Sequence, residues 1–213
     1  VKQISGLTEQ ARDRMDVIVV QTQHATDLVR QILDFSRQSM LMRQAVDLRA
    51  LCIEQVGLLE RALPEIINIK FEHEPDADYV VNGDATSLRQ IIMNLAINAR
   101  DAMPDGGTLR IKLAMLCYAT ERETPLAGMG VGEWVRLTVA DSGVGIPADI
   151  LPHIFDPFFT TKDPGKGTGL GLAQVHGIVA QHEGHLAVET DVNTGTTFHI
   201  YLAAVAASQE ANA

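Results

Sequence analysis

The apolar positions in the first part of this chain follow the spacing of a long helix. From about Glu9 to Met42 there is neither Pro nor Gly, and apolar or small residues recur in alternating steps of three and four. This heptad pattern predicts a helix, and additional apolar positions beside the seam favour a helical bundle over a two-stranded coiled coil. We expect residues 1–45 to mediate homodimerisation, because an unpartnered seam would leave much apolar surface in water. An ordinary helix packed on its own domain is the alternative.

From about residue 46 the pattern changes to short alternating strands and amphipathic helices. Asp47 and Asp84 are suited to cap helices, which Pro64 and the turn residues 104–107 would end. The expected helices span residues 48–63, 86–103 and 172–181, and the expected strands span residues 66–72, 79–81, 108–116, 133–140, 186–190 and 196–202. This order predicts an α+β fold, a two-layer α/β sandwich with helices on one face of the sheet. Residues 46–203 would form this domain and residues 204–213 a frayed tail.

The composition limits the partners of this chain. A formal net charge of −10 argues against binding to nucleic acid or to an anionic membrane surface, because both need a basic field. Cys52 and Cys117 lack the spacing of a zinc site or a disulfide framework, and no run of residues reaches the length of a membrane span. We expect a cytoplasmic location and no direct membrane contact for this fragment. Because the sequence begins with Val1, we expect a longer protein, whose membrane anchoring stays open.

A glycine-rich motif precedes the last expected helix. Gly165, Gly167, Gly169 and Gly171 stand at alternate positions before the apolar segment 172–181. Glycines let successive backbone N–H groups turn toward an anion, and the N-terminus of the following helix favours negative charge. The motif therefore predicts a phosphate-binding loop, with a flexible surface loop as the alternative.

Three polar residues share one face of the helix expected at 86–103. Asn94, Asn98 and Asp101 are spaced i, i+4 and i+7, beside an apolar stripe. Amide and carboxylate oxygens can hold a hydrated Mg²⁺ ion when phosphates complete its ligands. A solvated helix face is the alternative for this helix taken alone.

Two further segments suggest contacts with a nucleotide. Asp141 follows an apolar strand and precedes Gly143 and Gly145, so its carboxylate could accept a hydrogen bond from an amine on a flat ring, although such a sequence also forms ordinary turns. The segment 155–162 contains three of the six Phe residues of the chain and ends at Lys162. It reads as an aromatic lid or as a structural aromatic cluster.

These segments resemble a known family in their order and spacing. Residues 94–102, 141–146, 155–162 and 165–172 are similar to the N, G1, F and G2 boxes in the ATP-binding domain of sensor histidine kinases. The resemblance covers residues 46–202, and residues 27–38 look like the second helix of the family's dimerisation domain. It implies the Bergerat-type fold shared with gyrase, mismatch-repair ATPases and heat-shock chaperones.

The resemblance also implies roles for individual residues. Asn98 would hold Mg²⁺ beside Asn94 and Asp101, and Asp141 would receive the adenine amine, supported by the hydroxyl of Thr196. Asn94, Asn98 and Lys162 would act in catalysis. The remaining ATP contacts would come from Gly143, Gly145, Ile146, Phe158, Lys162, Lys166, Gly167, Thr168, Gly169, Leu170, Gly171 and Leu172.

Two departures from the family pattern bear on the reaction. Hydrolytic ATPases of this superfamily carry a Glu that acts on water four residues before the metal-binding Asn, and here that position is Asn94. A neutral amide does not take a proton, so transfer to a protein acceptor is favoured over hydrolysis. The family's phosphoacceptor box on the first dimerisation helix has no match here. His24 reads as a solvated or packed residue rather than as the acceptor.

The leading hypothesis is the catalytic part of a two-component sensor histidine kinase that uses ATP and Mg²⁺. The acceptor histidine would lie on a missing dimerisation helix, and a response regulator receiver domain would be the downstream partner. A regulatory ATP-binding module without chemistry and a serine-kinase-like anti-sigma factor are the alternatives.

Overall fold

The computed structural model describes residues 42–163 and 167–205. The helix expected in residues 1–45 therefore lies almost entirely outside the described residues, as do Gly165, Lys166 and most of the expected tail. The described residues fall into two units. One comprises residues 42–159 and 169–205, and the other comprises residues 160–163 and 167–168.

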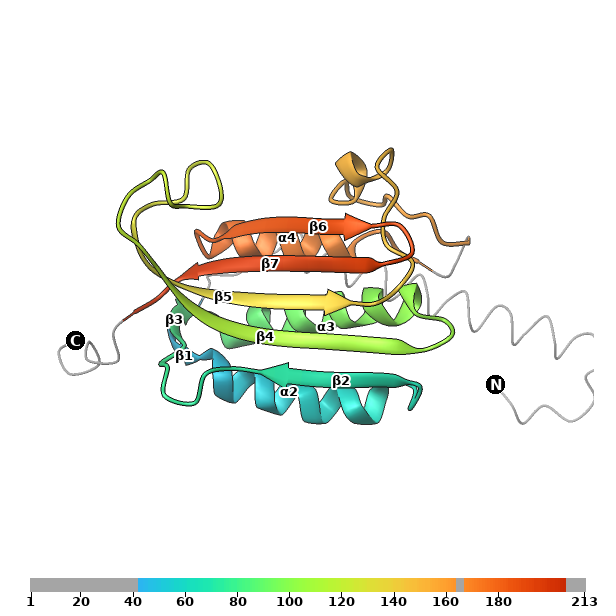
Figure 1. Ribbon diagram of the computed structural model, residues 1–213, viewed down its shortest axis with the longest axis horizontal. Coiled ribbons are helices and arrows are strands. Elements are labelled where there is room, and N and C mark those ends of the chain that lie inside the picture. The colour runs from blue at the N-terminus through green and yellow to red at the C-terminus, as the bar shows by residue number, and fades with distance from the viewer. Residues whose placement is uncertain (1–41, 164–166, 206–213) are drawn as a thin grey trace, which may run out of the picture. The chain divides into compact units, whose positions relative to one another are not determined.

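The larger unit is built on a five-stranded sheet with the strand order β2-β4-β5-β7-β6 (Figure 1). β2 pairs with β4 in parallel, and the other neighbouring pairs are antiparallel. β1 and β3 form a second, two-stranded antiparallel sheet. The strands are β1 (Gln44–Asp47), β2 (Ile67–Glu72), β3 (Val80–Gly83), β4 (Gly107–Tyr118), β5 (Gly132–Asp141), β6 (His185–Asp191) and β7 (Gly195–Ala203).

Three helices cover one face of the sheet (Figure 1), which confirms the predicted two-layer sandwich. The Asp47 carboxylate accepts hydrogen bonds from the first backbone N–H groups of one helix, and Asp84 caps the next one at Ser87 N, so both predicted caps are confirmed. The helices are α2 (Leu48–Ala62), α3 (Ala85–Ala102) and α4 (Gly171–Gln181). A short 3₁₀ helix, η1 (Leu151–His153), was not predicted.

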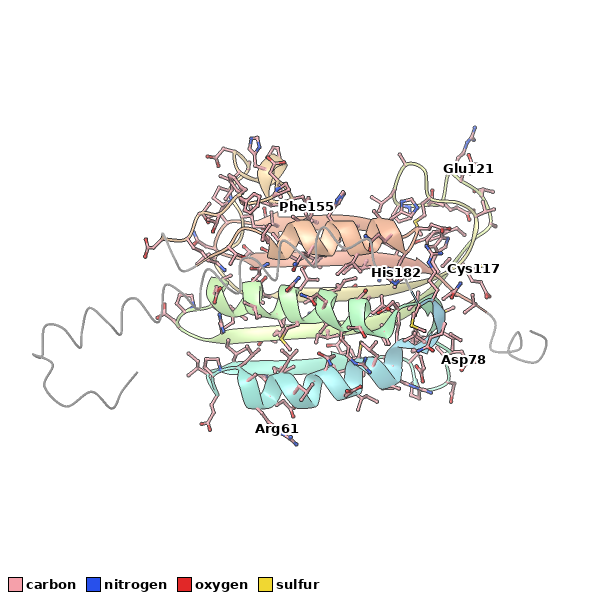
Figure 2. All side chains as sticks on the ribbon, turned by 180° about the vertical axis from the view of Figure 1, so that it is seen from behind. Arg61, Asp78, Cys117, Glu121, Phe155 and His182 are labelled. Atoms are coloured by element: carbon pink, nitrogen blue, oxygen red, sulfur yellow. The ribbon has the colours of Figure 1, made fainter. Side chains whose placement is uncertain are left out.

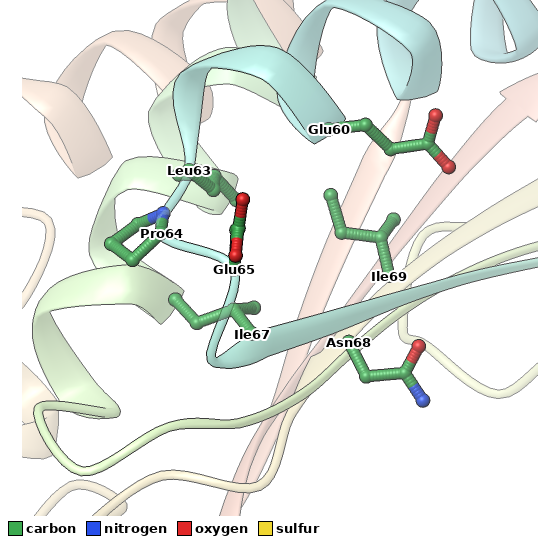
Figure 3. Close-up of a pocket in the computed structure, with 7 residues that line it drawn as sticks. All are labelled: Glu60, Leu63, Pro64, Glu65, Ile67, Asn68 and Ile69. Atoms are coloured by element: carbon green, nitrogen blue, oxygen red, sulfur yellow. The ribbon is translucent and has the colours of Figure 1, made fainter.

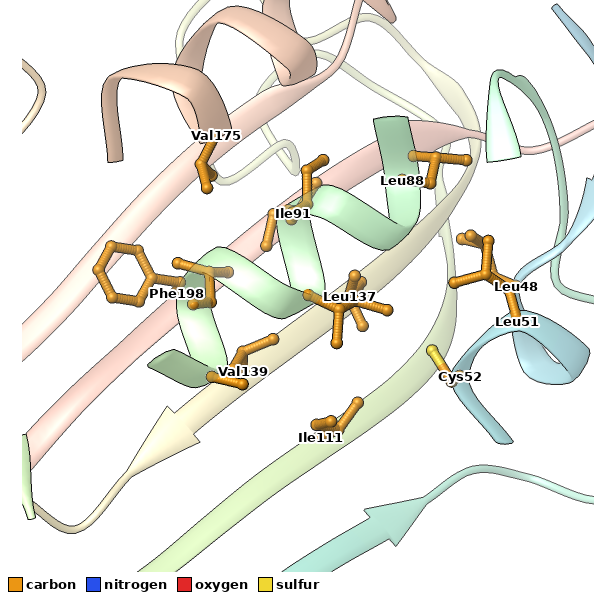
Figure 4. Packing of buried hydrophobic residues seen from close by; sticks show 14 of the residues in the cluster. Leu48, Leu51, Cys52, Leu88, Ile91, Ile111, Leu137, Val139, Val175 and Phe198 are labelled. Carbon is orange, nitrogen blue, oxygen red and sulfur yellow. The ribbon is translucent and has the colours of Figure 1, made fainter. Parts of the chain in front are cut away.

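The hydrophobic core lies between this face and the helices. Leu137 and Val139 of β5 and Ile111 of β4 face Ile91 of α3, and all four side chains are at most 2% exposed (Figure 4). Their alternation along the strands is the pattern that predicted a sheet with one buried face.

The domain is longer at both ends than its predicted limits of 46 and 203. β1 begins at Gln44 and pairs with β3. At the other end Ala204 N donates to Glu133 O, and Val205 N donates to Val80 O. Ala204 and Val205 are therefore bonded to the domain. Sequence pattern missed these additions because each depends on a partner strand far away in the chain.

A buried histidine fixes the pairing of α3 with α4 (Figure 2). His182, at the end of α4, donates from Nδ1 to Ile178 O (2.8 Å) and accepts at Nε2 from Asp84 N, the cap of α3 (3.0 Å). One imidazole nitrogen must donate and the other accept, so this geometry requires the neutral ring. The end of α4 is thus held at the beginning of α3, and the two helices run in opposite directions.

The sequence predicts no disulfide framework, no zinc site and no membrane span, and the described residues bear on each of these points. Cys52 and Cys117 are free cysteines, and burial raises the pKa of the Cys52 thiol to about 12. Among residues 42–163 and 167–205 there is no cluster of three or more His, Cys, Asp or Glu side chains suited to a metal, and none of the helices there could cross a membrane.

Candidate functional site

The segment that follows β5 is held on three sides by backbone hydrogen bonds. Val144 N donates to Ala102 O at the end of α3 (3.0 Å), and Ser142 N donates to Thr108 O of β4 (3.2 Å). From the β6–β7 turn, Asn193 N donates to Val144 O (2.8 Å). These contacts fix the loop to α3, β4 and the β6–β7 turn, so the side chains at its start are presented on a rigid frame.

Close backbone packing requires glycine at two positions of this loop. A Cβ atom on Gly143 would lie 2.5 Å from Ala102 O, and one on Gly145 would lie 2.1 Å from Asp191 O. Gly145 also has a φ of +69°, in the left-handed region that favours glycine. The structure therefore gives both glycines a packing role, while their predicted contact with a base stays a prediction.

We expect Gly145→Ala to lower the free energy of unfolding by about 3 kcal/mol or more, because the new methyl group meets a backbone oxygen in a strained conformation. Gly57→Ala in α2 is the matched control, since nothing lies within 4 Å of the added Cβ. There the gain in helix propensity should stabilise the protein by about 1 kcal/mol. Urea denaturation of both variants checks this, and a Gly145→Ala protein as stable as the unchanged chain would contradict it.

Asp141 lies at the end of β5 with a carboxylate that is only partly satisfied by the protein. Its Oδ1 atom accepts from Gly143 N (2.9 Å) and from Thr196 N (3.3 Å), whereas Oδ2 has no hydrogen-bond partner among the described residues. Burial raises the pKa of Asp141, and the two backbone hydrogen bonds counteract part of this shift. A half-buried acceptor with one open oxygen is suited to bind an N–H donor of a ligand.

Threonines on the neighbouring strands support Asp141 in a way that differs from the prediction. The backbone N–H of Thr196, rather than its hydroxyl, donates to Asp141. The buried Thr196 hydroxyl meets Thr190 Oγ1 (3.2 Å), which also accepts from Ile146 N (2.8 Å). Sequence reasoning missed Thr190, because nothing in a Thr at a strand end signals contacts with a loop more than forty residues earlier.

The raised pKa of Asp141 predicts a pH dependence of stability. The folded state takes up the proton more readily than the unfolded state, so this group lowers the free energy of unfolding as pH rises from the ordinary pKa of 3.8 through the raised value. The Asp141→Asn variant should lack this component. Denaturant unfolding of both proteins across that acidic range measures it, and identical pH profiles would contradict the assignment.

Asn94 and Asn98 lie on the side of α3 that faces the beginning of α4. Asn94 Nδ2 donates to Gly171 O and to Gln174 Oε1, both at 3.1 Å. The amide of Asn98 has no hydrogen-bond partner among the described residues, and its Nδ2 atom is 3.9 Å from the position of a Cβ on Gly171. Among residues 42–163 and 167–205, no side chain caps the N-terminus of α4. An open amide therefore stands beside the uncapped start of a helix, where anions bind favourably.

Asp101 contacts the neighbouring residue of its own helix, and its predicted place beside a metal ion stays a prediction. Its carboxylate forms an ion pair with the adjacent Arg100 (Nη2 to Oδ1, 2.7 Å). Asn94, Asn98 and Asp101 do share the predicted spacing, but the structure engages Asn94 with α4 and Asp101 with Arg100. The Oδ1 atom of Asn94 and the amide of Asn98 have no hydrogen-bond partner among the described residues, so both side chains keep a polar group open to a ligand.

Three apolar residues that the resemblance assigns to the ATP site also have packing roles. Leu170 is 1% exposed, and Leu172 and Ile146 pack against the hydrophobic core. Burial of these side chains is sufficient to explain their apolar character. Their predicted contacts with ATP stay predictions.

The aromatic segment is joined to the start of the last helix by a backbone hydrogen bond between Phe158 and Gly169, both in the larger unit. Phe158 has a φ of +69°, is 59% exposed and donates from its N to Gly169 O (3.0 Å). A Cβ on Gly169 would lie 2.4 Å from the carbonyl carbon of Phe158, so this crossing also needs glycine. Phe155 packs on the ring of His176 at 5.3 Å between centroids, which supports a packing role for this histidine. The two ends of the expected lid thus lie together.

The small unit contains the other described residues of the expected lid. Within it, Lys162 N donates to Thr160 Oγ1 (3.2 Å), and a Cβ on Gly167 would lie 2.7 Å from the same oxygen. Gly167 therefore allows close packing against Thr160. The predicted phosphate contacts of Lys162, Gly167 and Thr168 stay predictions, and Lys166 lies outside the described residues.

A pocket at the edge of the sheet offers a different and less suitable site (Figure 3). It lies between the end of α2 and β2, and none of the predicted ATP-binding residues lines it. Its charged side chains are Glu60 and Glu65, which would repel the phosphates of a nucleotide. The end of β5 is therefore the better candidate.

The residues at the end of β5 and the start of α4 fit ATP and Mg²⁺ by their chemistry. Asp141 has an open carboxylate oxygen for an exocyclic amine, and Asn98 has an open amide oxygen for a hard cation. Asn98 lies one turn before Ala102, whose carbonyl holds the loop after Asp141. The residues predicted to contact the base, the cation and the phosphates thus belong to one connected part of the fold.

Comparison with known proteins decides the family. A family model described as "Histidine kinase-, DNA gyrase B-, and HSP90-like ATPase" matches residues 83–206, more than half of the chain. The chain belongs to this ATPase family. The matched region contains α3, α4, four strands of the five-stranded sheet and the segments around Asn98 and Asp141, whereas α2 and β2 precede it.

Several relatives within the family are sensor histidine kinases. The chain is 41% identical to the sensor kinase CckA of Brucella abortus over 178 residues, which cover 84% of this chain and 19% of CckA. Full-length ShkA in complex with AMPPNP superposes with a TM-score of 0.72 at 26% identity, over 95% of this chain and 41% of that one. ThkA in complex with the response regulator protein TrrA gives a TM-score of 0.66 at 25% identity, over 94% and 53%. The chain spans about a fifth of the length of CckA.

Proposed function

We propose that this ATPase-family chain binds Mg-ATP and transfers the γ-phosphoryl group to a histidine side chain, as the catalytic part of a two-component sensor histidine kinase. The observation that carries the proposal is the connected site formed by the open carboxylate of Asp141, the open amide of Asn98 and the uncapped start of α4. The AMPPNP bound to the structural relative ShkA supports the nucleotide class.

In this proposal the residues of the chain bind and orient ATP. The open oxygen of Asp141 accepts a hydrogen bond from the adenine amine, which places the base on the rigid loop after β5. The oxygen of Asn98 holds Mg²⁺, which when bound supplies neutralisation of phosphate charge. The first N–H groups of α4 face the phosphates and favour their negative charge.

The proposed acceptor is a histidine ring nitrogen on a dimerisation helix. Its lone pair forms a bond to the γ-phosphorus while the bond from that phosphorus to the bridging oxygen breaks, and ADP leaves. Asn94 does not favour attack by water, because it is a neutral amide whose N–H groups are already engaged with α4. The site is therefore better suited to phosphoryl transfer than to hydrolysis.

We also propose a response regulator receiver domain as the downstream partner and a homodimer through the N-terminal segment. The complex of the relative ThkA with TrrA supports the first of these partners. The heptad pattern of residues 15–32 supports the second.

Isothermal titration of the full chain with ATP tests the binding step. We expect saturable binding that is at least about tenfold tighter with Mg²⁺ than with excess EDTA, because the cation neutralises phosphate charge at Asn98. GTP is the matched control ligand, since it offers a carbonyl oxygen where ATP offers the amine for Asp141. Equal affinity for ATP and GTP, or no effect of Mg²⁺, would contradict the proposed site.

A further inference from the structure

Gln174 connects α4 to two residues of α3 through a single oxygen. Its Oε1 atom lies 3.1 Å from Asn94 Nδ2 and 3.4 Å from Gln90 Nε2. Asn94 Nδ2 also donates to Gly171 O, in the first turn of the same helix. The predicted motifs include neither Gln174 nor Gln90. These hydrogen bonds join residues that are about eighty positions apart in the sequence.

The backbone carbonyl of Gly171 fixes the orientation of every amide in this group. A carbonyl oxygen can only accept, so the nitrogen of Asn94, rather than its oxygen, must face Gly171. The second hydrogen on that nitrogen then points to Gln174, which must present its oxygen. Gln90 accordingly donates to the same oxygen. The three side chains form one consistent arrangement, and reversing any amide would place like atoms together.

In this arrangement the side-chain oxygen of Asn94 has a defined orientation and is open to a ligand. Both hydrogens of its amide are engaged with α4, and its Oδ1 has no hydrogen-bond partner among the described residues. Asn98 lies one turn further along α3, beside Gly171. Together with the Gly171 carbonyl, Gln174 therefore supports two features near Asn98: the direction of an open oxygen and the distance from α3 to the first turn of α4.

We propose that Gln174 is a positioning residue that acts through Asn94 to set the alignment of the phosphates for transfer. The inference rests on the proposed function. Gln174 lies on α4, while Asp141 holds the adenine at the end of β5. Loss of the Gln174 oxygen therefore leaves the adenine contact in place and affects phosphoryl transfer more than ATP affinity.

The test compares Gln174→Met with the unchanged chain, using a dimerisation domain that carries a phosphoacceptor histidine. Methionine has a similar length but lacks the strong acceptor. We expect the transfer rate at saturating ATP to fall about fivefold to tenfold, with the ATP dissociation constant within about twofold, since one hydrogen bond is lost away from the base. Gln181→Met, at the exposed end of α4, is the matched control and should transfer at the unchanged rate.

A double-mutant cycle separates positioning from general stability. If Gln174 acts through Asn94, the Gln174→Met change should have no further effect on transfer in an Asn94→Ala background. Additive effects of the two changes, or full transfer by Gln174→Met, would overturn the inference. Gln174→Ala, checked by thermal unfolding, replaces Gln174→Met if that variant does not fold. No transfer by the unchanged chain would instead remove the proposed function itself, and with it this inference.

Discussion

The Asp141→Asn variant is expected to bind ATP about tenfold to a hundredfold more weakly than the unchanged chain. A hydrogen bond to a charged acceptor contributes about 1.5–3 kcal/mol, which corresponds to this range of affinity. Asparagine has nearly the same shape, but it replaces one acceptor oxygen with an N–H donor that repels the adenine amine. Isothermal titration with Mg-ATP measures the effect.

Stability and a matched control distinguish lost binding from lost folding. Burial raises the pKa of Asp141, so the charged form is disfavoured in the fold and its removal should not lower the free energy of unfolding at neutral pH. Asp105→Asn, in the exposed turn after α3, should bind ATP normally. ATP affinity of Asp141→Asn within twofold of the unchanged chain would contradict the assignment of the base site.

The Asn98→Ala variant is expected to lose the Mg²⁺-dependent part of ATP binding and to lower phosphoryl transfer about a hundredfold. Removal of one preorganised group that stabilises charge developing in the transition state lowers the rate of reaction by about this factor. The side chain has no hydrogen-bond partner among the described residues, so its removal breaks no hydrogen bond there and should leave stability nearly unchanged. Titrations with Mg²⁺ and with EDTA, together with single-turnover transfer, measure both effects.

Asn68→Ala provides the matched control for this change. Asn68 is exposed on β2, and β4 separates its strand from β5. It should retain both the effect of Mg²⁺ and the rate of transfer. An Asn98→Ala protein that still binds ATP more tightly with Mg²⁺ than with EDTA would show that the cation is held elsewhere.

Local sequence pattern predicted the elements that position the site. The alternating strand before Asp141 and the two glycines after it placed the carboxylate at a strand end. The capping residues Asp47 and Asp84 located the beginnings of α2 and α3. These predictions succeeded because each depends on chemistry within a few residues of the chain.

Long-range contacts account for most of what sequence reasoning missed. The bond from Asn94 to Gln174 and the bond from Ile146 to Thr190 join residues that only the folded sheet and helices bring together. The glycines of the loop after β5 show a related difficulty. Their pattern predicted contact with a base, whereas the structure explains Gly145 by its closeness to the backbone of Asp191. A glycine pattern alone does not distinguish these two causes.

Transfer of label from γ-³²P-ATP tests the central proposal most directly. The full chain is incubated with Mg-ATP and with a dimerisation domain that carries a phosphoacceptor histidine, and that histidine is replaced by Gln in a parallel reaction. We predict acid-labile label on the domain, which is absent from the Gln variant and strongly reduced with Asn98→Ala. Saturable ATP binding without any label on the histidine would contradict the proposal and favour a non-catalytic ATP-binding module.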